Sequence, residues 1–331
     1  MKKKPSTKTD PRQEQLELYT TSKLNDLIQQ GTSPSTLRAY RQDQIRFWAY
    51  TQKQFGLDEH YPVDIKIIMA FVLDHMEGNH VQKLKISTIK RYISSVGIVH
   101  QEKGYPSPAL HPQVKLLVKR ARRAYKNQQP VQKVAATKSI VQKLIDTCDH
   151  TLHGIRDKAL ILVGFGAGGR RREELANLDV SDIKALANGN YMLCIRASKT
   201  DQEAEGREVP VTGSAARALK CWLAKSGITH GRVFRGIKRN DELLPSITGR
   251  TICRVVQKAA EDAGFDPSEF GAHSLRAGFM TEAVKHKVPL LEAMELSGHK
   301  TLAVAQRYYR SADLENNRAA NLLDNQIDIE E

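Results

Sequence analysis

Hydrophobic residues in the first third of the chain recur at intervals of three and four, which places their side chains on one face of an α-helix. The segment 87–102 carries on one such face Ile89, Tyr92, Ile93, Val96 and Val99. The same spacing predicts further helices over residues 14–29, 36–54, 62–76 and 112–125. Since no alternating strand pattern interrupts these segments, an all-α first domain is predicted.

The rest of the chain mixes two periodicities. Helical spacing predicts helices over residues 139–148, 156–166, 214–225, 248–263, 274–286, 289–296 and 301–309. Two short β-rich runs, 191–195 and 208–211, flank a polar segment and predict a hairpin. An amphipathic segment over residues 314–323 predicts a C-terminal helix. The fold class is therefore predicted to be mainly α with a small β-sheet, an all-α domain followed by an α+β domain.

Changes in composition suggest the boundaries between these parts. Residues 1–12 are polar and basic, and the sequence Asn-Gln-Gln-Pro at 127–130 ends the last helix of the first domain. We expect a basic tail over residues 1–12, a helical domain over 13–125, a linker over 126–137 and a second domain over 138–331.

The net charge of +14 is concentrated at the front of the chain. Residues 1–136 hold 23 basic and 11 acidic side chains, whereas residues 137–331 hold 28 and 26. Such an excess fits a polyanionic partner, because Lys and Arg that meet phosphates release condensed counterions. A merely soluble basic surface gives the same totals, so charge alone leaves both interpretations open.

The fifth predicted helix has the most uneven charge. Between residues 112 and 133 there are seven basic side chains and no acidic one. Charge runs are usually solvated faces, but the complete lack of acids favours a surface that follows a phosphate backbone. The candidate DNA-binding residues are Lys115, Lys119, Arg120, Arg122, Arg123 and Lys126.

Several other classes of protein fit the sequence poorly. The cysteines form no C-x-x-C pair, which argues against a zinc site or a disulfide framework and fits a reducing cytoplasm; they are Cys148, Cys194, Cys221 and Cys253. The longest apolar run, 159–169, is shorter than a bilayer span and predicts a buried core helix instead. The start of the chain carries no apolar signal segment, and the chain has no phosphate-binding Gly-rich loop for ATP. We therefore expect a cytoplasmic protein without a membrane span.

Four patches of the second domain carry residues suited to phosphate chemistry. Their contents are Gly-Gly-Arg-Arg-Arg-Glu-Glu-Leu at 168–175, Lys199 after a strand, His-Ser-Leu-Arg at 273–276, and Gly298-His299 followed by Tyr308 and Tyr309. Each patch alone is a weak signal: the arginines fit a surface turn, the lysine an exposed hairpin, and the histidines and tyrosines ordinary packing.

In combination, the ordered set Arg, Lys, His-x-x-Arg, Gly-His and Tyr resembles the tyrosine recombinase, or phage integrase, family. The family's R-x-x-E-L motif selects Arg171 among the three adjacent arginines, and its tyrosine, nine residues after the second His, corresponds to Tyr308. The resemblance implies a core-binding domain, a catalytic domain and the catalytic set Arg171, Lys199, His273, Arg276, His299 and Tyr308, supported by Glu174. Within the family, the basic helix before the linker and the C-terminal Tyr-x-Arg-x-x-Asp are similar to Cre-like recombinases.

Two departures from the family pattern affect this alignment. Gly169-Arg170 stands where Gly-Leu is commoner, which leaves the register of the three arginines open. Tyr309 is the alternative nucleophile; adjacent helical residues point about 100° apart, so only one of the pair is expected to face the phosphate.

The resemblance implies transesterification of a phosphodiester. A phenol with a pKa of about 10 needs a proton acceptor, a role that falls to His273. Arg171 and Arg276 are expected to clamp the non-bridging oxygens, with His299 as a third donor, while Lys199 protonates the departing 5′ oxygen. Neither a metal nor another cofactor is implied.

The family implies a homotetramer that exchanges strands of double-stranded DNA at a specific site through a Holliday junction. The 314–323 helix then docks on a neighbouring subunit or packs on its own domain. Two alternatives remain at this point: a tyrosine-type topoisomerase that nicks and reseals without exchange, and a non-catalytic DNA-binding regulator of the same fold. The sequence of the DNA target cannot be derived from one chain.

Overall fold

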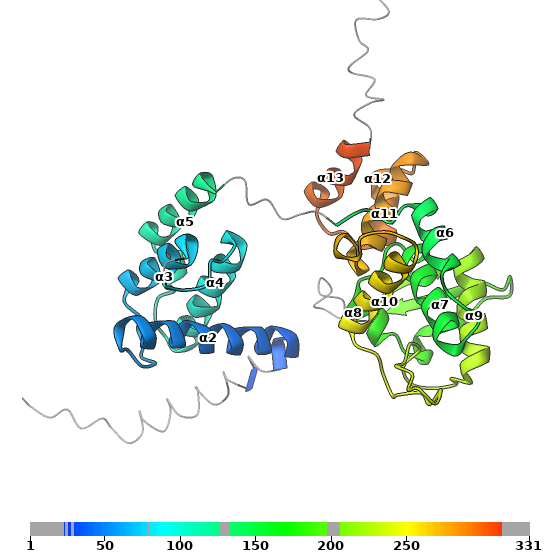
Figure 1. Cartoon of the computed structure of the whole chain (residues 1–331), viewed down its shortest axis with the longest axis horizontal. Coiled ribbons are helices and arrows are strands. Elements are labelled where there is room, and N and C mark those ends of the chain that lie inside the picture. The colour runs from blue at the N-terminus through cyan, green and yellow to red at the C-terminus, as the bar shows by residue number, and fades with distance from the viewer. Residues whose placement is uncertain are drawn as a thin grey trace, which may run out of the picture. The chain divides into compact units, whose positions relative to one another are not determined.

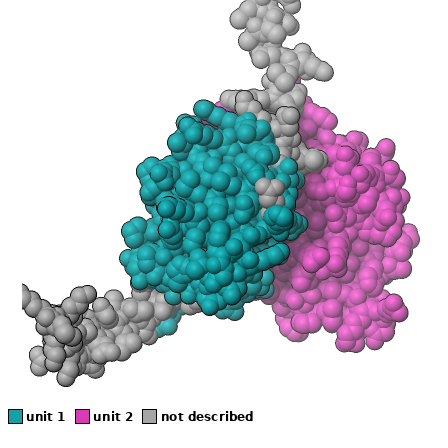
Figure 2. Space-filling view, turned by 60° about the vertical axis from the view of Figure 1, so that its left-hand side comes forward, with its two compact units in different colours: residues 1–130 teal, residues 131–331 magenta. Residues whose placement is uncertain are grey.

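The chain divides into two compact units, Met1–Pro130 and Val131–Glu331 (Figure 2). The computed structural model describes residues 30–78, 80–125, 133–196 and 206–312, together with residues 23, 26 and 27. The predicted tail 1–12, most of the first predicted helix, the front of the 126–137 linker and the predicted helix 314–323 lie outside the described residues.

The described part of unit 1 is helical, as its periodicity predicted (Figure 1). It contains α2 (Pro34–Phe55), α3 (Ile65–Glu77), α4 (Ile86–Glu102), the 3-10 turn η1 (Pro108–Leu110) and α5 (Pro112–Ala124). The helix α2 begins where the Ser33 side chain accepts the Thr36 N–H, and it ends at Gly56 in the left-handed region. The hydrophobic core of unit 1 consists of closely packed aromatic and branched side chains, among them Phe47, Ile68, Phe71 and Val96.

Unit 2 is built from helices around a small sheet (Figure 1). Its helices are α6 (Lys138–Asp146), α7 (Leu152–Gly166), α8 (Arg172–Asn177), α9 (Gly213–Ser226), α10 (Gly249–Asp262), α11 (Ala272–Lys285), α12 (Leu290–Ser297) and α13 (Leu302–Ala312), with 3-10 turns η2 (Val180–Asp182) and η3 (Pro267–Glu269). None of the described helices is both long and apolar enough to cross a bilayer. Of the apolar run 159–169 predicted as a core helix, residues 159–166 lie in α7, whose Leu160, Ile161 and Val163 are fully buried, and the last three residues follow its end.

Within the described part of unit 2, the sheet has three antiparallel strands in the order β1 (Ile183–Ala185), β2 (Tyr191–Ile195) and β3 (Arg207–Val211). In the register, Leu193 lies opposite Val209 and Ile195 opposite Arg207. The buried face of the sheet packs on Trp222 of α9 in the main core of the unit. The sequence missed β1, because three residues are too few to show a period of two.

Candidate active site

Five of the six predicted catalytic residues come together in unit 2. They lie on four segments: the loop between α7 and α8, the start of α11, the turn after α12, and α13. The contacts described below join Arg171, His273, Arg276, His299 and Tyr308. The sixth residue, Lys199, lies outside the described residues.

The loop after α7 can approach α11 only because it contains glycine. Gly168 and Gly169 have φ of +86° and +70°, in the left-handed region. A Cβ on Gly169 would lie 2.5 Å from Arg276 Cα, well inside ordinary carbon contact. The two glycines therefore bring the backbone before Arg171 directly against the first turn of α11.

Glu174 holds the Arg171 side chain at the start of α8. Its carboxylate accepts from Arg171 Nη1 at 2.6 Å and from the Arg171 backbone N–H at 3.2 Å. The Arg171 guanidinium also donates to the Gly298 carbonyl through Nη2, at 3.4 Å. Glu174 is buried while Arg171 is partly exposed, so the arginine is fixed from the protein side.

Arg276 lies at the centre of the site and is buried. Its Nη1 donates to the carbonyls of Gly169 and Ser297, at 2.9 and 2.6 Å, and its Nε donates to His299 Nε2 at 3.2 Å. Its Nη2 is also buried, yet has no hydrogen-bond partner among the described residues. Burial and then the nearby Arg171 lower the pKa of Arg276 to about 10, which leaves it cationic at neutral pH.

The His299 imidazole is neutral and has a defined tautomer. Because Arg276 Nε donates to Nε2, the ring proton lies on Nδ1, which is 2.7 Å from Ser297 Oγ. Burial, followed by the charges of Arg276 and Arg171, lowers its pKa to about 3. In this arrangement Nε2 is an acceptor. The hydrogen bond that His299 is expected from the sequence to donate to a phosphate oxygen therefore requires the opposite tautomer.

Tyr308 faces His273 of the same chain. The Tyr308 hydroxyl lies 3.4 Å from His273 Nε2, and the Tyr308 ring is 6.1 Å from that of His299. Burial lowers the pKa of His273, and the charges of Arg276 and Arg171 lower it further. A neutral imidazole is therefore available to take the phenol proton. The side chain of Tyr309 lies outside the described part of the structure.

Sequence reasoning missed two further arginines at this site. Arg170 has no exposed surface; its Nη2 donates to Leu296 O at 2.5 Å, and its Nη1 lies 3.5 Å from Glu174 Oε2. Burial lowers the pKa of Arg170 to about 9, against the opposing effect of Glu174. Arg207, at the start of β3, donates to Glu295 O at 3.0 Å. The one signal for Arg170 in the sequence is its position in the motif, where the family more often has leucine.

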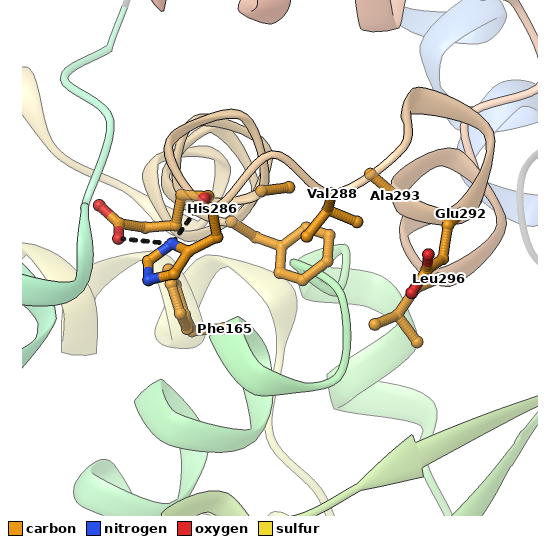
Figure 3. Close-up of a pocket in the computed structure, with 9 residues that line it drawn as sticks. Phe165, His286, Val288, Glu292, Ala293 and Leu296 are labelled. Atoms are coloured by element: carbon orange, nitrogen blue, oxygen red, sulfur yellow. Dashed lines mark hydrogen bonds and ion pairs between the residues drawn. The ribbon is translucent and has the colours of Figure 1, made fainter.

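An apolar pocket adjoins the turn that carries His299. It is a cavity of about 270 Å³, lined by Phe165, Phe279, Glu282, Ala283, His286, Val288, Glu292, Ala293 and Leu296 (Figure 3). Figure 3 shows Leu296 and Ala293 on one helix with Phe165 on another segment. Leu296 thus contributes its side chain to the pocket wall and its carbonyl to Arg170.

The basic residues of α5 are exposed in unit 1. Lys115, Lys119 and Arg122 line a second cavity of about 270 Å³ together with Lys90 of α4. Arg120 and Arg123 are exposed as well, whereas Lys126 lies outside the described residues. Within the described part of the chain, no group of three or more His, Cys, Asp or Glu side chains could hold a metal ion.

Comparison with known proteins gives the same family as the motifs. The profile described as "Phage integrase family" matches residues 136–315. An integrase/recombinase xerD homolog of Selenomonas ruminantium is 28% identical over 312 residues, covering 90% of this chain and 88% of the relative. The recombinase cre of Escherichia phage P1 is 22% identical over 272 residues, covering 76% of this chain and 79% of the relative.

Solved structures confirm the predicted fold class. XerH bound to a palindromic difH substrate in a post-cleavage complex has a TM-score of 0.58 at 18% identity, covering 92% of this chain and 85% of that one. A lambda integrase dimer bound to a COC' core site also has a TM-score of 0.58, at 17% identity, covering 95% of this chain and 98% of that one. The profile spans more than half of the sequence and includes the residues of the site. The chain therefore belongs to the phage integrase family of tyrosine recombinases.

Proposed function

We propose that this protein is a site-specific recombinase that cleaves and rejoins double-stranded DNA through a 3′-phosphotyrosine formed on Tyr308. One observation carries the proposal. The buried Arg276 has a donor, Nη2, without a partner among the described residues, in a site where Tyr308 also meets a neutral His273. A buried guanidinium donor left open in this way suits a non-bridging phosphate oxygen.

In the cleavage step, Tyr308 Oη attacks the scissile phosphorus while its proton passes to His273 Nε2, which lies 3.4 Å away. The bond from phosphorus to the 5′ oxygen breaks, and the Lys199 ammonium protonates that oxygen. Arg171 and Arg276 stabilise the charge that develops on the non-bridging oxygens. Removing one such donor costs on the order of 10²–10³ in rate, by analogy with oxyanion holes.

His299 contributes a further donor after a change of tautomer. The Ser297 hydroxyl, 2.7 Å from Nδ1, can act as donor as well as acceptor. When a phosphate oxygen takes the Arg276 donors, Ser297 can donate to Nδ1, and Nε2 then carries the proton. His299 thereby supplies a hydrogen bond to phosphate without becoming cationic, which fits its strongly lowered pKa.

Religation reverses these steps with a 5′ hydroxyl from a partner strand. Exchange between two sites requires several active sites in one assembly, so we propose a homotetramer on DNA that passes through a Holliday junction. The segment 314–323 follows α13 and contains apolar residues at helical spacing. We propose that it occupies the apolar pocket beside Leu296 on a neighbouring subunit. The exposed cations of α5 are proposed to contact DNA phosphates.

A covalent-trapping experiment tests the function. Nicked duplexes tiled across the DNA that adjoins the gene are incubated with the protein, since loss of the short 5′-hydroxyl fragment prevents religation. We expect a protein–DNA adduct with one duplex, lost in Tyr308→Phe and retained in Tyr309→Phe. An adduct retained in Tyr308→Phe and lost in Tyr309→Phe would transfer the nucleophile to Tyr309. Recombinant products from two intact sites distinguish strand exchange from a topoisomerase, and binding without any adduct supports a regulator.

A further inference from the structure

Four consecutive backbone carbonyls at the end of α12 each accept a hydrogen bond from a different arginine. The donor and acceptor atoms are 3.0, 2.5, 2.6 and 3.4 Å apart, in the pairs Arg207–Glu295, Arg170–Leu296, Arg276–Ser297 and Arg171–Gly298. The arginines come from three places in the sequence: the adjacent Arg170 and Arg171 just before α8, Arg207 at the start of β3, and Arg276 in α11.

The C-terminal end of a helix is suited to binding several cationic side chains. Its last four carbonyls lack partners within the helix and together carry about half a negative charge. Four guanidinium groups around one small site repel one another, and the carbonyls of α12 offset part of that repulsion before a phosphate binds. Of the four arginines, Arg171 and Arg276 belong to the proposed catalytic set, whereas Arg170 and Arg207 do not.

We propose that Arg170 and Arg207 are positioning residues, which fix the last turn of α12 and through it the placement of His299 for DNA cleavage. This inference rests on the proposed recombinase chemistry for its effect on rate, but its effect on His299 can be measured without DNA. Neither residue needs to touch the phosphate in order to act.

The placement of Arg207 supports this role. Besides its bond to Glu295 O, its guanidinium packs on Gly298, where a Cβ would collide with it. Gly298 has a φ of +72°, so the turn requires glycine for its backbone as well as for this contact. Arg207 also pairs with Ile195 across the sheet. One side chain therefore ties the strand pair whose connection contains Lys199 to the residue that precedes His299.

The burial of Arg170 supports the same role at the adjacent carbonyl, Leu296 O. Its Nε and Nη1 form no hydrogen bond among the described residues, so its desolvation is only partly offset. The offset comes from Glu174, from Leu296 O at 2.5 Å and from the longer bond of Nη2 to Gly168 O at 3.4 Å. Apolar packing alone would favour an apolar side chain at this position, so the guanidinium is explained by the carbonyl that it holds.

The test compares Arg207→Gln with Arg207→Lys and with a matched control, Arg196→Gln. The substitution Arg196→Gln removes the same charge just after the end of β2, where Arg196 forms an ion pair with Asp182. The site-bearing nicked duplex provides the adduct rate and the Kd, and NMR titration of labelled histidine in the DNA-free protein provides the pKa of His299. Arg170→Leu is measured in parallel, with thermal unfolding to check its fold.

We expect Arg207→Gln to slow adduct formation about 10- to 100-fold, since small displacements of a catalytic group have effects of this size. The Kd should change less than about twofold, and the His299 pKa should rise from about 3 as the turn loosens. Arg207→Lys should recover most of the rate, and Arg196→Gln should match the parent.

Two results would overturn the inference. One is an unchanged rate with an unchanged His299 titration in Arg207→Gln. The other is a slower rate with His299 unchanged, which would mean that Arg207 acts on the DNA directly. If the parent protein forms no adduct on any duplex, the proposed function fails, while the His299 titration still decides the positioning role. If Arg170→Leu does not fold, the Arg207 variants decide alone.

Discussion

Replacing Gly169 with alanine tests whether the close approach of the α7–α8 loop to α11 sets the active site. Gly169 has a φ of +70°, and an added Cβ would lie 2.5 Å from Arg276 Cα. Carbon atoms in contact are normally about 3.5–4.0 Å apart, so the two segments must separate by about 1 Å. A displacement of that size can reduce a catalytic rate by about 100-fold.

A matched control separates this collision from backbone strain. Gly227, at the end of α9, has a φ of +65°, and nothing lies within 4 Å of a Cβ added there. Both variants incur the left-handed strain of about 1–2 kcal/mol. For a unit of this size, 1 kcal/mol lowers the Tm by about 2–4 °C, so Gly227→Ala should lose about 2–8 °C and keep its activity.

The assay is single-turnover adduct formation on the nicked site, read together with thermal unfolding. We expect Gly169→Ala to lose about 100-fold in adduct rate and to unfold at a lower temperature than Gly227→Ala, because the collision adds to the shared strain. Equal adduct rates in the two variants would refute the reasoning, because the separation of the loop from Arg276 would then have no catalytic effect.

Three further predictions follow from burial and charge. In the proposed mechanism, protonation of His273 removes the proton acceptor. Because the pKa of His273 is lowered, the acid limb of the adduct rate should lie below about pH 6.5, and a plateau that begins only above pH 7 in a rate–pH profile would exclude this assignment. Glu174→Gln leaves Arg170 without its buried counter-charge and should lower the free energy of unfolding by about 1–3 kcal/mol, measured by urea denaturation, with wild-type stability as the contrary outcome. In unit 1, His100 Nε2 accepts the Val63 N–H, and burial lowers the pKa of His100, so the stability linked to this residue is present above about pH 6.5 and is lost as the pH falls toward the folded pKa. The free energy of unfolding of His100→Gln should therefore depend less on pH between 7 and 5 than that of the parent, and parallel plots of unfolding free energy against pH for the two proteins would contradict this.

The sequence by itself determined most of the helices, though not α8, and the identity of the motif residues. Helix positions follow from local spacing, and α2, α4 and α5 lie within a few residues of the predicted segments. The order and spacing of Arg171, His273-x-x-Arg276, Gly298-His299 and Tyr308 were sufficient to identify the family. The same local pattern could not show β1, since three residues carry too little periodicity.

Only the tertiary structure decided how these residues are held. The bonds from Arg170 to Leu296 O and from Arg171 to Gly298 O join residues 126 and 127 positions apart, and no local pattern encodes such a contact. In the sequence, Arg170 is only an irregularity in a motif, whereas in the structure its guanidinium is fully buried against the end of α12. The tautomer of His299 was also set in three dimensions, because it depends on which neighbours donate and accept, Arg276 and Ser297. Sequence fixes which groups are present, but burial and hydrogen bonding, which arise only when distant segments meet, fix their charge and orientation.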